Sequence, residues 1–256
     1  MKLLKRTLYF VGLPIVLILL WWVLTLGEVN FYTPKPGQLV QTFVDVWFSE
    51  RFFDDVLPSL TRLAIGVVVA ILLGIALGTL IGSVRWLRQL FEPLLEFFRA
   101  IPPPVLVPLL LLLVGVNDQM KILVIISGAL WPVLLNTVEG VRAVDDVLGD
   151  ATRVYGIHGF ARIRYLVLPS ASPQIMAGVR QCLSIALILM VISEMFASSS
   201  GLGFTIIQFQ RSFAIPEMWS GIVLLGLIGI ALSLIFQFVE RRILHWYYGL
   251  KELHTT

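Results

Sequence analysis

Residues 150–169, DATRVYGIHGFARIRYLVLP, form a polar interruption between two apolar segments. They lie in a connection that covers residues 139–172, whereas neighbouring helices in a bundle are commonly joined by about 2–8 residues. Residues 147–155 are predicted to form a short helix that ends at Gly156, because glycine suits the backbone of a helix C-cap. Asp150 and Arg153 are predicted to pair one turn apart. The loop therefore indicates a surface for another protein, and the alternative is a solvated connection without a partner.

The composition indicates a membrane protein. Hydrophobic residues make up 58% of the chain and charged residues 14%, far from a soluble average. The mean hydropathy of +0.91 points the same way. The net charge of +3 requires no nucleic-acid partner. Cys182, the one cysteine, excludes an internal disulfide and is expected to be an inert, buried thiol.

Apolar segments are long enough to cross a bilayer, which takes about 20 residues each. We predict an all-α, polytopic membrane protein with about six transmembrane helices, at residues 8–26, 58–83, 90–115, 120–138, 173–197 and 219–240. The first segment follows basic residues and could be a signal peptide. Its apolar run is too long for that and no small-x-small cleavage site follows, so an uncleaved anchor is expected.

The distribution of Lys and Arg predicts the orientation. With the N-terminus in the cytoplasm, twelve of the nineteen basic residues fall on the cytoplasmic side. Those on the outside are Lys35, Arg51, Lys121 and Arg211, and those within spans are Arg62, Arg99 and Arg180. Cytoplasmic loops carry the excess of basic residues. Both termini and the loop 139–172 are therefore predicted to be cytoplasmic.

The outside segment after the first span is predicted to contain an amphipathic helix. Prolines at 34 and 36 exclude an earlier helix. Leu39, Phe43, Val46 and Trp47 then recur at helical spacing. This helix would either lie at the membrane interface or pack on the rest of the protein.

Two spans carry residues that constrain their packing. Gly74, Gly78 and Gly82 fall one turn apart and allow another backbone to approach closely, from this chain or from a second copy. Residues 101–104, Ile-Pro-Pro-Pro, exclude a straight helix in the third span. A broken helix in a membrane needs cover for its freed carbonyls, so this segment is predicted to face the protein interior. Glu92, Glu96 and Arg99 form a stripe just before it.

Catalytic and metal sites are not predicted. His158, His245 and His254 all fall in cytoplasmic segments, and no span carries a His pair, a Cys/His cluster or an Asp pair. No G-x-x-x-x-G-K-[ST] motif occurs, so the chain is not expected to bind ATP by a P-loop. The chain is expected to be no enzyme, and its energy source must be a partner or an ion gradient.

The loop resembles the "EAA" loop of ABC-importer permeases, whose pattern is E-A-A, three residues, Gly, nine residues, I-x-L-P. Ala151, Gly156, Leu168 and Pro169 match, while Asp150 and Thr152 replace Glu and Ala. Further motifs follow in the order of the nitrate/sulfonate/taurine-type permeases: residues 33–36, 59–62, 74–82, 99–102, 132–136 and 194–203. The resemblance covers about residues 33–245 and implies the type I permease fold.

The resemblance implies a function and partners. The chain would be the permease of an ATP-driven importer in the bacterial inner membrane, carrying a small solute such as a sulfonate, nitrate or carboxylate. Its partners would be a second permease copy, two ATPases that bind ATP and Mg, and an external binding protein. This chain itself would bind no cofactor. The ATPase-coupling residues would be Asp150, Ala151, Thr152, Arg153, Gly156, His158, Leu168 and Pro169.

The division of the chain follows from these assignments. Residues 1–57 are the anchor and external helix, residues 58–245 the permease core with its coupling loop 139–172, and residues 246–256 a cytoplasmic tail. Two other classes fit less well. A permease of the methionine or glycine-betaine type would share the loop. An ion-coupled secondary transporter predicts an inverted repeat, and we find none between the two halves.

Polar residues within the spans are candidates for the translocation path or its gate, namely Ser127, Asn136, Ser184, Ser193 and Glu194. The hydroxyl and amide groups could instead bond neighbouring helices. Arg62 and Glu194 lie at similar depth near the outer face and are predicted to form a structural ion pair, because charges within spans usually pair. The alternative is that each reaches interfacial water separately.

Overall fold

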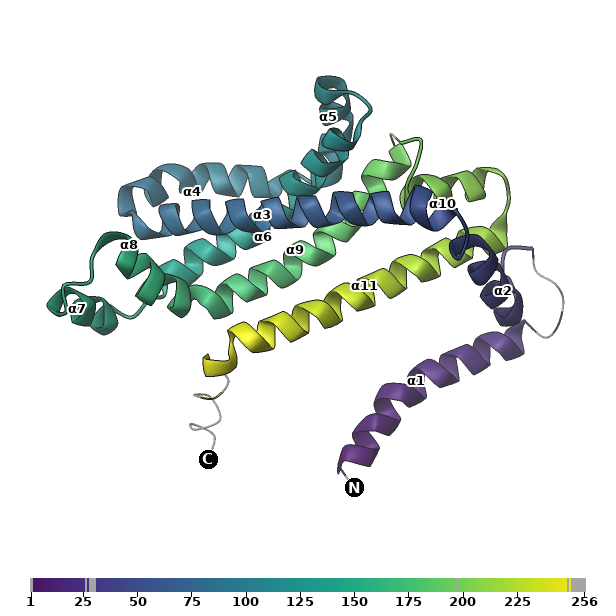
Figure 1. Ribbon diagram of the computed structural model, residues 1–256, viewed down its shortest axis with the longest axis horizontal. Coiled ribbons are helices and arrows are strands. Elements are labelled where there is room, and N and C mark those ends of the chain that lie inside the picture. The colour runs from purple at the N-terminus through teal and green to yellow at the C-terminus, as the bar shows by residue number, and fades with distance from the viewer. Residues whose placement is uncertain (1, 26, 28–30, 197, 248, 250–256) are drawn as a thin grey trace. The chain divides into compact units, whose positions relative to one another are not determined.

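The computed structural model describes residues 2–25, 27, 31–196, 198–247 and 249, and these residues form helices without strands (Figure 1). The predicted tail over residues 246–256, including Lys251 and His254, lies largely outside the described residues. The elements in chain order are α1 (Lys2–Leu24), α2 (Pro36–Trp47), η1 (Phe52–Val56), α3 (Leu57–Ser83), α4 (Arg85–Ala100), η2 (Pro103–Val105), α5 (Leu106–Val114), α6 (Asp118–Arg142), α7 (Asp146–Val154), α8 (Gly159–Arg162), η3 (Ile163–Val167), α9 (Leu168–Phe196), α10 (Leu202–Arg211) and α11 (Ile215–Ile243).

Four of the described helical runs are long and apolar enough to cross a membrane. They are Phe52–Ser83, Asp118–Arg142, Gly159–Phe196 and Ile215–Ile243. A fifth span results if α4 and the segment Pro103–Val114 are counted as one. The predicted number of about six is therefore higher than the four to five found, because the described apolar part of α1, Gly12–Leu24, is shorter than a span.

The third predicted span is broken at its prolines. Helix α4 and the following segment are bent by 77°. Ile101, which precedes Pro102, has an extended backbone with ψ of 118°, as the proline ring requires. The prediction that this segment faces the protein interior is only partly right: Val107 is buried and Pro103 half-buried, whereas Pro102, Pro104 and Val105 are exposed.

The chain divides into two compact units. The first holds the described residues up to 58 and residues 199–227, and the second holds residues 59–198 and the described residues from 228 onward. In the first unit, Trp47 at the end of α2 is 2% exposed and donates a hydrogen bond of 2.9 Å to Ser220 Oγ. Leu39 is also buried. One face of the predicted amphipathic helix therefore packs on the protein, while Val40 and Val44 remain exposed.

Helix α6 is the centre of the second unit and packs on α3 along one face. A Cβ placed on Gly74 would lie 2.7 Å from Val133 Cβ, and one on Gly78 would lie 2.6 Å from Thr137 Cβ. Gly66 and Gly82 meet Ile125 and Val141 in the same way. The contacts recur at intervals of four or eight residues on both helices. The partner that the glycines admit is thus α6 of the same chain.

Helix α9 packs along another face of α6 in the opposite direction. A Cβ on Gly128 would lie 2.3 Å from Leu189 Cδ1, and one on Gly140 would lie 3.1 Å from Ala171 Cβ. Near the middle, a Cβ on Gly178 would lie 2.7 Å from the carbonyl oxygen of Pro132. Because backbone meets backbone on both faces of α6, the three helices form one closely packed layer of spans.

The segments that lead into α3 and α9 begin alike. Val-Leu-Pro-Ser occurs at residues 56–59 and again at 167–170, each time at the end of a five-residue π-helical turn, η1 or η3. A proline ring clashes with the carbonyl four residues earlier in an α-helix. A wider turn ahead of Pro58 and Pro169 relieves that clash, so each long helix continues through its proline.

Candidate coupling loop and buried ion network

Helix α7 is capped at both ends. At its start, the Asp145 carboxylate accepts hydrogen bonds from the backbone N–H groups of Val147 (2.7 Å) and Leu148 (3.2 Å). At its end, Gly156 has φ of +69°. The N–H groups of Gly156 and Ile157 donate to the carbonyls of Arg153 and Thr152, at 3.1 and 2.8 Å. This is a Schellman motif, and it shows why glycine stands at position 156.

The predicted coupling residues are arranged around this helix. Arg153 Nη1 lies 2.9 Å from Asp150 Oδ1, so the predicted pair is present on the exposed face. Ala151 and Thr152 are half-buried, and His158 is the exposed N-cap residue of α8. Leu168 and Pro169 open α9 directly after η3. The structure thus places the eight residues along one continuous path from α7 into α9.

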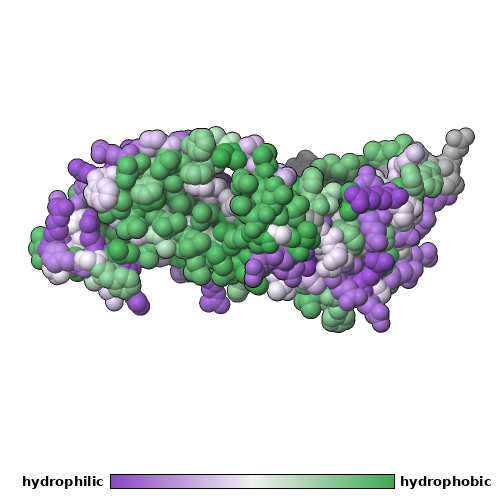
Figure 2. Space-filling model, turned by 90° about the horizontal axis from the view of Figure 1, so that it is seen from above, coloured by the Kyte–Doolittle hydropathy of each residue, from purple (hydrophilic) through white to green (hydrophobic). Residues whose placement is uncertain are grey.

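Large apolar side chains on the loop were missed by the sequence analysis. Val147 is 76% exposed, Val154 85%, Tyr155 81% and Phe160 75%. Exposed apolar groups of this size on a polar loop mark an interaction surface. Figure 2 shows hydrophilic residues gathered at the left end of the view, where α7 lies in Figure 1, with apolar residues among them. The signal available in the sequence was the presence of these apolar residues between the charged residues of the loop.

A buried ion network joins the beginnings of α3 and α6 to the end of α9. Arg62 Nη1 lies 2.7 Å from Glu194 Oε1, so the predicted ion pair is present. The Arg62 side chain is 5% exposed and that of Glu194 0%. Ser59 Oγ donates to both Glu194 oxygens at 2.7 and 2.9 Å. Such hydrogen bonds offset the loss of hydration of a buried carboxylate.

The network extends beyond the predicted pair. Arg62 Nη2 lies 2.8 Å from Asp118 Oδ1, and Lys121 Nζ lies 3.3 Å from the same oxygen. Asp118 stands in the first turn of α6, where the helix dipole favours a negative charge. Two cations and two anions are thus balanced at one end of three spans. The sequence did not reveal Asp118 and Lys121 as members, because Asp118 joins the network through Arg62, which lies 56 positions away in the chain.

The remaining path candidates bond mostly within their own helices. The hydroxyls of Ser127 and Ser193 donate to the carbonyls of Val124 and Met190 at 2.8 and 2.9 Å. Asn136 donates to Pro132 O at 2.8 Å and accepts from Gln174 Nε2 of α9 at 3.0 Å. Ser184 differs, because it lines a cavity together with Arg180.

Comparison with known proteins assigns the family. Residues 70–245 match the family model described as binding-protein-dependent transport system inner membrane component. The chain belongs to this family. The permease is similar to a Bacillus subtilis protein named as an aliphatic sulfonates transport permease, SsuC, with 32% identity over 91% of this chain and 86% of the relative. It is 28% identical to the taurine transport system permease protein TauC of Escherichia coli, over 93% of this chain and 89% of the relative.

A solved structure supports the fold. An inward-facing MetNI methionine ABC transporter matches the permease with a TM-score of 0.63 at 19% identity, over 74% of this chain and 94% of that chain. The family and its relatives, which are transport permeases and not enzymes, identify the protein as a membrane permease subunit of an ABC importer. Membership of the family implies ATPase and binding-protein partners.

Proposed function

We propose that the permease forms the membrane path of an importer for a small oxoanion, such as a sulfonate, nitrate or carboxylate. Support comes from relatives named as permeases for aliphatic sulfonates, taurine and nitrate. The methionine transporter shares only the fold at its level of identity, so it gives no support for a methionine-type substrate. An external binding protein would deliver the anion, and both termini of the permease would be cytoplasmic.

The coupling loop is the observation that carries the ATP-driven part of this proposal. Its helix α7 is fixed at both ends by side-chain and backbone hydrogen bonds, yet it exposes large apolar side chains. A cytoplasmic ATPase would bind this surface.

The long helix after the loop provides a mechanical path. The helical run Gly159–Phe196 contains 38 residues and leads from the loop to Glu194 in the ion network. When ATP brings the two ATPases together, a shift of α7 would move this helix. Helices α3 and α6 would follow as one body, because their glycines leave no room for independent sliding. The path would then open alternately to the two sides.

Substitution of Gly156 by Trp tests the coupling. We expect the variant to lose ATP-dependent uptake by about tenfold or more. A side chain at positive φ costs about 1–2 kcal/mol, and the ring would stand on the proposed ATPase surface. The spans should stay folded, since nothing lies within 4 Å of a Cβ at this position. The measurements are copurification of the ATPase and uptake by reconstituted complexes.

The control is Gly156→Asn, because asparagine tolerates the left-handed conformation and is small. It should keep most of the uptake. Full transport by the Trp variant, with normal copurification of the ATPase, would contradict the proposed role of the loop.

We also propose that two copies of the permease surround the path, which would follow their two-fold axis. In the most apolar stretch of 18 residues in α11 only 6% of the residues are buried, so much of this helix is available to contact lipid or a second copy. Native mass spectrometry of the complex should detect two permease copies and two ATPases. One permease copy per two ATPases, with no second kind of permease subunit, would rule the arrangement out.

A further inference from the structure

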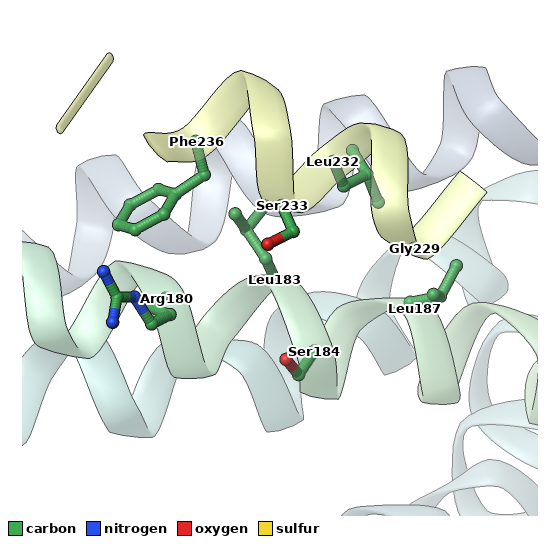
Figure 3. A pocket seen from close by; sticks show the side chains of 8 residues that line it. All are labelled: Arg180, Leu183, Ser184, Leu187, Gly229, Leu232, Ser233 and Phe236. Atoms are coloured by element: carbon green, nitrogen blue, oxygen red, sulfur yellow. The ribbon is translucent and has the colours of Figure 1, made fainter. Parts of the chain in front are cut away.

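A cavity lies between α9 and the part of α11 that belongs to the second unit, and it contains a basic side chain (Figure 3). Its volume is about 90 Å³. This is room for a small polyatomic ion, since a water molecule takes about 30 Å³ in the liquid. The lining residues are Arg180, Leu183, Ser184, Leu187, Gly229, Leu232, Ser233 and Phe236. Figure 3 shows the guanidinium of Arg180 beside the Phe236 ring and the two serine hydroxyls farther along the cavity.

Arg180 is held in place from one side. Its Nη2 lies 2.6 Å from Glu240 Oε2, and its guanidinium carbon lies 5.4 Å from the centre of the Phe236 ring. The bond to Glu240 uses one of the five N–H donors of a guanidinium. The side chain of Arg180 is 61% exposed, whereas that of Glu240 is 11% exposed. The pair therefore orients the guanidinium without covering it.

The position of Arg180 in the membrane makes this exposure informative. The residue stands about two turns inside the cytoplasmic edge of the span predicted at residues 173–197. An exposed charge on the lipid face of a span is costly, so such groups face the bundle interior or a water-filled cavity. A wider, open cavity of about 600 Å³ is in fact lined by Arg180, Ser233, Gln237, Glu240 and Arg241. Arg180 and Ser233 line both cavities and so stand where they meet.

The chemistry of the lining favours an anion. Arg180 and Arg241 against Glu240 leave one positive charge at the wider cavity. The hydroxyl of Ser233 accepts from Gln237 Nε2 at 3.3 Å, so its own proton remains available to a ligand. Guanidinium and hydroxyl groups are donors that suit oxygen atoms of sulfonate, nitrate or carboxylate. Leu183, Leu187 and Leu232 can contact the carbon skeleton of an organic anion.

We propose that Arg180, with the hydroxyls of Ser184 and Ser233, is an oxoanion-binding site on the cytoplasmic half of the translocation path. The inference rests on the proposed function, because it needs the anion to pass through this permease. Glu240 is a positioning residue that holds the guanidinium of Arg180 toward the cavity. Its negative charge also weakens the attraction between Arg180 and the anion, so that the anion can leave.

The test uses the complete complex with its ATPase and binding protein in proteoliposomes, supplied in turn with taurine, ethanesulfonate, nitrate and bicarbonate. For the anion that the wild type transports, Arg180→Gln should reduce ATP-dependent uptake by about tenfold or more, since charge-assisted hydrogen bonds are the strong ones. The ATPase activity stimulated by the binding protein should change much less. Arg242→Gln is the matched control, because Arg242 bears the same charge, lies near Phe238 and lines neither cavity.

The variants of Glu240 separate anion binding from a purely structural ion pair. If Arg180 binds the anion, Glu240→Gln keeps more uptake than Arg180→Gln, and the double variant is as poor as Arg180→Gln. If Arg180 serves only to neutralise Glu240, the double variant recovers uptake, which would overturn the inference.

A phospholipid headgroup offers the same oxoanion chemistry, and native mass spectrometry distinguishes it. Loss of a bound phospholipid from the Arg180→Gln complex with undiminished uptake would assign the site to lipid and overturn the inference. A wild-type complex that takes up none of the four anions would instead overturn the proposed function. Transport by the wild type with equal transport by Arg180→Gln would overturn the inference alone.

Discussion

Substitution of Arg62 by Gln is expected to lower the free energy of unfolding by about 3–5 kcal/mol, because removing one partner of a buried ion pair takes the opposite charge away from a buried carboxylate. The Glu194 side chain is 0% exposed, so its carboxylate cannot regain water when the guanidinium is gone. Glu194→Gln should cost less, because Arg62 keeps Asp118 at 2.8 Å. This difference between the two single variants is specific to the network.

Equilibrium unfolding of the purified permease in mixed micelles measures these differences. Arg99→Gln is the control: Arg99 pairs with Glu96 at 2.7 Å, but both side chains are more than half exposed. Its effect should stay below about 1 kcal/mol. The charge swap Arg62→Glu with Glu194→Arg should recover part of the loss. Additive effects of the two residues in a double-mutant cycle would exclude the coupling.

Replacement of Gly78 by Leu is expected to lower the free energy of unfolding by about 3 kcal/mol, similar to the effect of Arg62→Gln, or to prevent the spans from assembling. The first side-chain atom alone would lie 2.6 Å from Thr137 Cβ and 2.8 Å from the carbonyl oxygen of Leu134. A carbonyl in a helix cannot turn away as a flexible side chain can. The leucine would therefore push α3 away from α6 and open gaps at the neighbouring glycine contacts.

Gly226→Leu is the matched control, since this glycine lies in α11 with nothing within 4 Å of a Cβ. It should be tolerated, because leucine favours a helix more than glycine does. The yield of monodisperse protein in detergent and the unfolding midpoint compare the two variants. Equal behaviour of the two leucine variants would show that α3 and α6 do not depend on the glycine contacts.

Features that depend on local sequence were predictable. The predicted spans at residues 58–83 and 120–138 correspond to α3 and α6 within a few residues, because their apolar runs have clear ends. The Arg62–Glu194 pair was predictable from depth, since two charges at one level of a membrane have few other partners. The break at residues 101–104 was predictable from proline chemistry, although its angle of 77° was not.

Features that depend on packing between distant segments were not predictable. The glycines of α3 indicated a close neighbour, but the opposing positions on α6 are valine, threonine and isoleucine, which carry no mark of a close contact. The pairing of Arg180 with Glu240 joins residues 60 positions apart. The sequence showed a polar loop at α7, whereas the exposure of Val154 and Tyr155 depends on how α7 lies on η3.

The most direct test of the central claim is uptake by proteoliposomes that contain the permease with and without its partner ATPase. We expect uptake of an oxoanion only when three components are present together. These are the ATPase, ATP in the lumen on the same side of the membrane as the ATPase, and the external binding protein. Substitution of Gly156 by Trp should abolish most of it in the same vesicles. Uptake by the permease alone, driven by a proton or sodium gradient without ATP, would contradict the account.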